Sequence, residues 1–83
     1  MKKFNEPITV RCGKERDGFE KLQALCEKEA EKMVESINIS TGEEMEVVFW
    51  TSDPCSELIG VAYFTKDEEG KVTYKLDYSE TTL

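Results

Sequence analysis

One segment, GFEKLQALCEKEAEKMVESI at residues 18–37, constrains the fold more than any other part of the chain. Its apolar residues recur at spacings of three and four, which at about 100° per residue places them on one face of a helix. They are Phe19, Leu22, Leu25, Cys26, Ala30, Met33, Val34 and Ile37. The interior lacks Pro and Gly and is rich in good helix formers. The segment therefore predicts one long amphipathic helix, with Asp17 as its cap and Asn38 or Gly42 as a left-handed turn after it.

Four other segments have the residue pattern of β-strands. Before the helix, apolar and polar residues alternate over 8–12, after a proline that suits the start of an edge strand. After the helix, strand patterns cover 43–51, 58–65 and 71–78, with a Gly-containing turn between the last two. This order predicts an α+β fold, β-α-β-β-β. We expect a four-stranded, mostly antiparallel (mixed) sheet with one amphipathic helix packed on one face.

The connections between these segments limit the topology. The last three strands follow one another directly, so they predict an antiparallel meander with 58–65 in the middle. Because the helix returns the chain, strand 8–12 should run parallel to 43–51 at a sheet edge, and either outer strand of the meander is a partner for it. We expect residues 1–83 to form a single domain, with 79–83 as a loose tail.

The two central strands are apolar on both faces, although a sheet with one wet side normally alternates apolar and polar residues. We assign to the helix the face with Met45, Val47, Phe49, Leu58, Gly60, Ala62 and Phe64. The opposite face carries Val48, Trp50, Ile59, Val61 and Tyr63. Such a patch usually marks an interface, so we expect a homodimer through these residues. A different partner, or cover by the termini or by the loop at 51–57, remains an alternative.

The charge of the chain restricts its partners. Eighteen acidic residues against eleven basic ones give a net charge of −7, which argues against direct binding to nucleic acid or to anionic membranes. On the predicted helix, four acidic residues fall within about 80° of one another. They are Glu20, Glu27, Glu31 and Glu35. Their spacing of about 6 Å resembles that of phosphates along a nucleic-acid strand. A basic protein partner fits this acidic surface, although a solvated helix face beside the lysines at 21, 28 and 32 is an alternative.

The sequence offers little for catalysis. Histidine is absent, and the three cysteines form no CxxC pair, so we expect no metal ligands, cofactor-binding residues or catalytic residues. We expect Cys12 and Cys26 to be core residues. The acidic neighbours of Cys55 raise the pKa of a thiol, which does not suit a nucleophile. We therefore expect that the protein is not an enzyme.

These features favour a small acidic protein that acts by binding other proteins. No apolar run of 18 residues and no signal-peptide pattern is present, so we expect a cytoplasmic protein with reduced thiols. By analogy, an inhibitor of a basic nucleic-acid-handling protein, of the kind that phages and mobile elements encode, fits the size and charge. The alternatives are a small-ligand-binding module with a pocket near Trp50 and Tyr63, and a thiol-dependent redox protein that uses Cys12 or Cys55.

Overall fold

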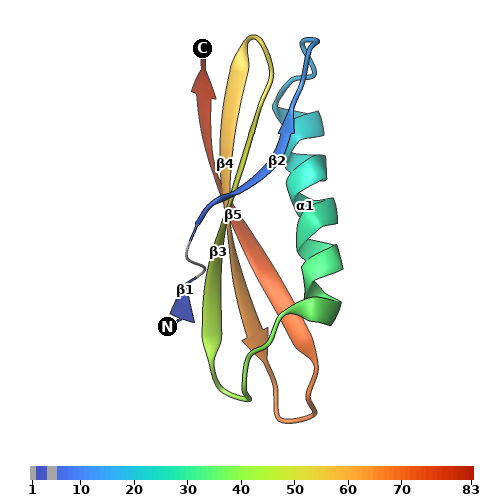
Figure 1. Cartoon of the computed structure of the whole chain (residues 1–83), viewed down its shortest axis with the longest axis vertical. Coiled ribbons are helices and arrows are strands. Elements are labelled where there is room, and N and C mark those ends of the chain that lie inside the picture. Colours follow the sequence, from blue (N-terminus) through green and yellow to red (C-terminus); the bar gives the residue numbers. More distant parts are fainter. Residues whose placement is uncertain (1, 4–5) are drawn as a thin grey trace.

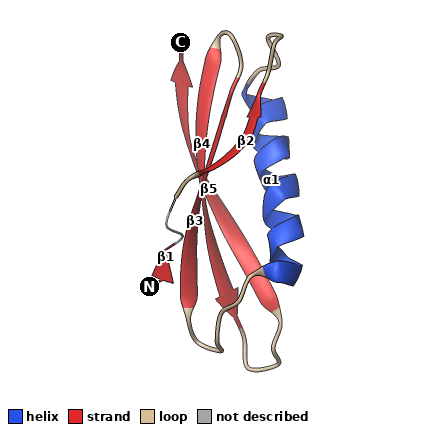
Figure 2. Ribbon diagram, in the orientation of Figure 1, coloured by secondary structure: helices blue, strands red, loops and turns tan. Residues whose placement is uncertain are grey.

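The computed structural model describes residues 2–3 and 6–83. A sheet and one helix lie against each other as two layers, with α1 along one side of the sheet (Figures 1 and 2). The elements are β1 (Lys2–Lys3), β2 (Ile8–Cys12), α1 (Phe19–Ser36), β3 (Glu44–Ser52), β4 (Ser56–Lys66) and β5 (Val72–Thr82). The predicted α+β class, with one helix on a mixed sheet, is confirmed.

The sheet is four strands wide, although it contains five strand segments. β3, β4 and β5 form the expected antiparallel meander. β1 and β2 both pair in parallel with β3, where Lys3 lies beside Glu46 and Ile8 lies beside Phe49. The first strand of the meander is thus the partner of segment 8–12, which the sequence had left open. The pattern did not predict β1, because two residues are too few to show an alternation.

The core lies between α1 and the face of the sheet that the sequence assigned to the helix. It contains Leu22, Cys26, Ala30, Ile39, Val47, Phe49, Leu58, Ala62 and Phe64, each at most 3% exposed. Tyr74, Leu76 and Tyr78 of β5 pack against its border. Burying a large apolar side chain of this kind contributes about 1.5–3 kcal/mol, so the contact between the helix and the sheet is a major source of stability.

Gly60 lets the helix and the last strand approach the middle of the sheet. It pairs in register with Tyr78 of β5. A Cβ atom at Gly60 would lie 3.3 Å from Cε1 of Tyr78 and 3.4 Å from Sγ of Cys26. The ring of Tyr78 and the thiol of Cys26 therefore occupy the space that a side chain at position 60 would need.

The helix begins at Phe19 and receives no side-chain cap from Asp17, so that prediction is wrong. Gly18 occupies the capping position with φ at +83°, a conformation that a glycine adopts without strain. Its N–H donates to Oδ2 of Asp53 at 2.9 Å. Asp17 instead pairs with Arg11 at 3.1 Å. After the helix, Gly42 has the expected positive φ of +82°.

The strands β4 and β5 are longer than the sequence predicts. β4 begins at Ser56, and β5 continues to Thr82, with which Ser56 pairs in register. The N–H of Leu83 then donates to the carbonyl oxygen of Cys55 at 2.8 Å. The prediction of a loose tail at 79–83 is therefore wrong. Residues in this segment are mostly polar, and backbone pairing with β4, which has no side-chain signature, holds them in the sheet.

We predict that Gly60→Val lowers the free energy of unfolding by about 2–3 kcal/mol, because its extra carbons must displace the Tyr78 ring or the helix. Urea denaturation followed by circular dichroism measures the loss. Thr81→Val, which adds the same side chain at an exposed position of β5, is the control and should change stability by less than about 0.5 kcal/mol. Equal stability of the Gly60→Val variant and the unchanged protein would contradict the packing described here.

Candidate functional site

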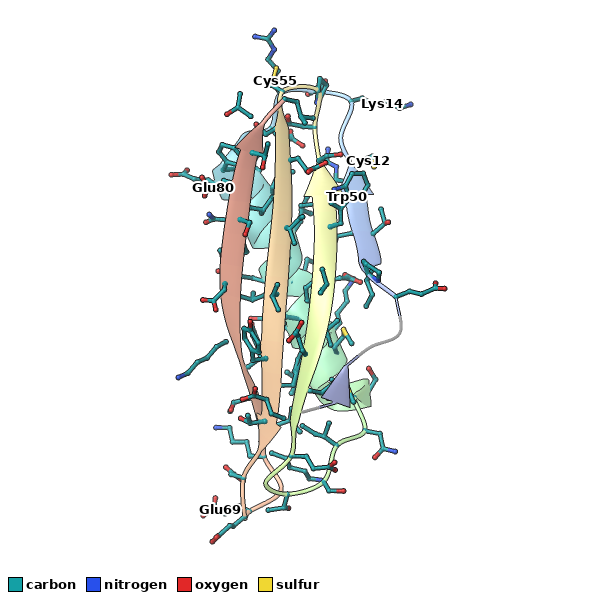
Figure 3. The ribbon with its side chains drawn as sticks, turned by 90° about the vertical axis from the view of Figure 1, so that its left-hand side faces the viewer. Cys12, Lys14, Trp50, Cys55, Glu69 and Glu80 are labelled. Atoms are coloured by element: carbon teal, nitrogen blue, oxygen red, sulfur yellow. The ribbon has the colours of Figure 1, made fainter. Side chains whose placement is uncertain are left out.

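The face of the sheet turned away from α1, called here the open face, holds the apolar residues that the sequence singled out. Val48, Trp50, Ile59, Val61 and Tyr63 all lie on it, and each is half-buried. In the part of the chain that the structure describes, α1 is the one helix and every strand belongs to the sheet. No second layer of the described residues therefore covers this face, which is turned toward the viewer in Figure 3.

The open face is apolar along the middle of β3 and β4 and polar on β5. Trp50 pairs with Ile59, and Val48 pairs with Val61, so these four side chains form a compact apolar block. Along β5, the residues beside Tyr63, Val61 and Ile59 are Lys75, Asp77 and Ser79. The cross-strand neighbours shield part of each apolar side chain, which explains why the block is half-buried instead of fully exposed.

A β-bulge in β2 changes which residues join the open face. The register shifts between Thr9, which lies beside Trp50, and Arg11, which lies beside Thr51. Cys12 then lies beside Ser52, with its Sγ 3.8 Å from the serine Oγ, and is exposed. The prediction that Cys12 is a core residue is therefore wrong, because the extra residue of a bulge reverses the alternation that follows it. Cys12 and Trp50 lie at the same end of the open face (Figure 3).

A depression of about 390 Å³ lies at the other end of the open face, near the hairpin between β4 and β5. It is lined by Glu44, Tyr63, Thr65, Thr73, Tyr74 and Lys75. Tyr63 belongs to its wall and Trp50 does not. The two residues that the sequence proposed for one ligand pocket therefore contribute to different parts of the same face.

The acidic stripe of α1 is exposed over its whole length. Its members are Glu20, Glu27, Glu31 and Glu35. The ion pairs among the described residues are Arg11–Asp17, Lys21–Asp17 and Lys32–Glu29. None of them involves the stripe. Two of the three helix lysines thus pair with carboxylates outside the stripe. Among the described residues, no ion pair neutralises a glutamate of the stripe.

The acidic stripe faces the side of the molecule where β5 lies. The hydroxyl of Tyr78 donates to the carbonyl oxygen of Gln23 at 3.4 Å and to Oε1 of Glu27 at 3.5 Å. Burial, followed by the negative charge of Glu27, raises the pKa of Tyr78 far above its ordinary value. Burial and the charges of Glu31 and Glu27 likewise raise the pKa of Tyr74. Both tyrosines therefore stay neutral and add no charge to the stripe.

The three thiols lie in different surroundings and do not form a joint site. Cys26 is fully buried in the core, and burial together with the nearby Glu27 raises its pKa to about 11. Cys55 is half-buried in the turn between β3 and β4, and Cys12 is exposed on the open face. Across the described residues, no group of three or more His, Cys, Asp or Glu side chains converges in a way that suits a metal ion.

The turn that carries Cys55 is organised by the carboxylate of Asp53. Its Oδ1 accepts hydrogen bonds from the N–H groups of Cys55 and Ser56 at 2.8 and 2.7 Å, and its Oδ2 accepts the bond from Gly18. These bonds lower the pKa of Asp53, the bond from Gly18 having the largest effect. The sequence pattern pointed to Cys55 as the residue of interest in this turn. The aspartate is the residue that joins the turn to the start of the helix.

Comparisons with known proteins found no matching protein family, no similar curated protein and no similar solved structure. Within the described ranges, no helix is long and apolar enough to cross a membrane.

We predict that Asp53→Asn destabilises the protein at pH 7, since the amide cannot accept all the N–H groups that the carboxylate accepts. The pKa of Asp53 in the folded state lies below its unfolded value of about 3.9. Its contribution is therefore complete above about pH 4 and is lost as the pH falls through the folded pKa. Urea midpoints measured between pH 7 and pH 2 should show a gap between variant and parent that narrows in acid.

Asp67→Asn is the matched control for this prediction. Oδ1 of Asp67 accepts hydrogen bonds from the N–H groups of Glu69 and Lys71 in the exposed turn between β4 and β5. Because water can replace those bonds, Asp67→Asn should lower the stability of the protein less than Asp53→Asn does. Two results would contradict the stabilising role of the Asp53 carboxylate. One is equal urea midpoints for Asp53→Asn and the parent at pH 7, and the other is a difference between them that widens in acid.

Proposed function

We propose that this chain is a small, non-enzymatic interaction protein that forms a homodimer through its open face and presents the acidic stripe of α1 to a basic protein. The observation that carries the proposal is the apolar block of Val48, Trp50, Ile59 and Val61, which no second layer covers in the described structure. Tryptophan and tyrosine are frequent anchors of protein interfaces, and symmetric self-association is the commonest way to cover such a surface.

The dimensions of the open face support a dimer. β4 contains 11 residues and is therefore about 36 Å long at about 3.3 Å per residue. Three strands at a spacing of about 4.8 Å span about 14 Å. Each copy thus offers roughly 500 Å², and two copies bury roughly 1,000 Å², which is the lower limit for a specific interface. A chain of 83 residues also gains stability from a second subunit, since small domains bury a modest fraction of their surface.

The acidic stripe supports a basic protein as the further partner. Its carboxylates are exposed and take part in none of the ion pairs among the described residues. Complementary charge raises the rate at which such partners associate. A protein that binds nucleic acid has the required basic surface, and a row of carboxylates at helical spacing competes for it. We therefore favour an inhibitor of a nucleic-acid-handling protein over a small-ligand carrier or a thiol enzyme.

We predict that the protein sediments as a dimer and that Trp50→Glu converts it to a folded monomer, because the substitution places a charge in the apolar block. The dissociation constant should rise by about thirty-fold or more, the effect of losing an interface anchor worth about 2 kcal/mol. Ala24→Glu, at an exposed position of α1 on the far side of the molecule, adds the same charge and should leave the dimer intact. A parent protein that sediments as a monomer would contradict the dimer.

We predict that the triple variant E27K/E31K/E35K loses salt-sensitive basic partners that the parent protein retains in a pull-down from native lysate. The control E15K/E68K/E69K reverses three exposed acids outside the stripe and changes the net charge equally. It should retain the same partners, identified by mass spectrometry. If both triple variants lose the partners to the same degree, total charge and not the stripe is responsible.

A further inference from the structure

One row of residues across the open face carries opposite charges at its two ends. Glu46 on β3 pairs in register with Tyr63 on β4, which in turn pairs with Lys75 on β5. Neighbouring strands lie about 4.8 Å apart, so Tyr63 separates the acid from the base by two strand spacings. Neither Glu46 nor Lys75 takes part in an ion pair among the described side chains. The backbone of β1 also brings Lys3 to the register position beside Glu46.

A symmetric dimer that packs open face on open face has two limiting arrangements. Its two-fold axis must lie in the plane between the two sheets, since only such an axis turns one face onto the other. Residues that pair across β3, β4 and β5 form a row, and the position of a row along the strands is called here its level. An axis along β4 sets β3 of one copy over β5 of the other and keeps each row at its own level. An axis across the strands sets β3 over β3 and reverses the order of the levels.

We propose that two copies of the chain associate with the axis along β4, so that Lys75 of each copy pairs with Glu46 of the other. In one copy the row runs from Glu46 through Tyr63 to Lys75. In the facing copy it runs in the opposite direction, so Tyr63 faces Tyr63 at the centre. This proposal rests on the homodimer proposed above and specifies its register. Face-to-face sheets pack with their strands within about 30° of parallel, which permits this arrangement. Trp50 then covers Ser79 of the second copy.

The axis across the strands does not pair the charges of this row at either favourable position. Placed midway between the levels of Val48 and Trp50, it packs the apolar block on itself, but it sets Glu46 over Ser52 and Lys75 over Thr81, so neither charge gains a partner. Placed instead midway between the levels of Val61 and Tyr63, it pairs Lys75 with Asp77 of the second copy. It also sets Glu46 over Val48 and Glu44 over Trp50. Each copy would then bury two carboxylates against apolar side chains, and unpaired buried charge is strongly unfavourable. The axis along β4 sets Asp77 of the edge strand over Val48, and it sets Glu57 over Glu57 of the second copy at the end of the face nearest the turn between β3 and β4.

A charge exchange between the two ends of the row tests the proposal. Glu46→Lys sets a lysine opposite Lys75, and Lys75→Glu sets a glutamate opposite Glu46. Each single variant should therefore raise the dimer dissociation constant by about tenfold or more. An equimolar mixture of the two variants should form heterodimers, and the double variant E46K/K75E should recover the homodimer. Native mass spectrometry separates heterodimer from homodimers by mass, and sedimentation gives the dissociation constants.

Asp77→Lys is the matched control, because it alters the net charge as Glu46→Lys does at a neighbouring position of the open face. It should remain a homodimer. Its mixture with Lys75→Glu should form fewer heterodimers than the mixture of Glu46→Lys with Lys75→Glu, because one of the two Glu46–Lys75 pairs is still lost. Equal amounts of heterodimer in the two mixtures, or no recovery in the mixture of Glu46→Lys with Lys75→Glu, would overturn the proposed register. If a charge reversal unfolds the monomer, a double-mutant cycle with Glu46→Gln and Lys75→Gln replaces it, and additive effects on the dissociation constant would overturn the pairing.

The outcomes separate this proposal from the homodimer on which it rests. A parent dimer that Trp50→Glu dissociates, while both charge reversals leave it unchanged, overturns the register alone. A monomeric parent protein overturns the homodimer and the register together. Recovery in the mixture supports both, because mixing the two variants restores opposite charges only where the two ends of the row meet.

Discussion

A single α-helix covers only one face of a sheet, and this constraint shapes the whole molecule. The 18 residues of α1 lie over β3, β4 and β5 and bury the apolar side chains of one face. Gly60 gives the helix and Tyr78 room to approach that face. In the part of the chain that the structure describes, no helix covers the other face, yet its two central strands carry large apolar side chains. The proposed interaction surface rests on this mismatch between the number of layers and the number of apolar faces.

The two proposed surfaces lie on different layers, which allows them to act together. A dimer formed through the open face has its sheets inside and its helices outside. Each acidic stripe then stays accessible on an outer layer, so one dimer presents two stripes to its partners. Two linked binding surfaces raise the overall affinity without any new contact, provided that the partner can reach both. Asp53 contributes to this geometry, since it ties the turn between β3 and β4 to the start of α1.

Much of the fold followed from periodicity, because the positions that face the helix repeat with the period of a helix or of a strand. The helix, the meander, the covered face and the residues of the open face were predicted in this way. The ends of the strands and the tail were not, since backbone pairing holds mostly polar residues such as Ser79 and Thr82 in the sheet. The exposure of Cys12 was also missed, because no residue pattern marks the bulge before it.

The sequence by itself determined which side chains share a face, because alternation along a strand depends only on the local backbone. It also determined the net charge and the absence of histidine, and thereby the classes of chemistry to expect. Only the tertiary structure decided which residues lie beside one another across the sheet. The row of Glu46, Tyr63 and Lys75 exists because the strands pair in one register, and a shift of one residue would place its members on different faces. Register depends on contacts between segments that are distant in the chain, which no local pattern records.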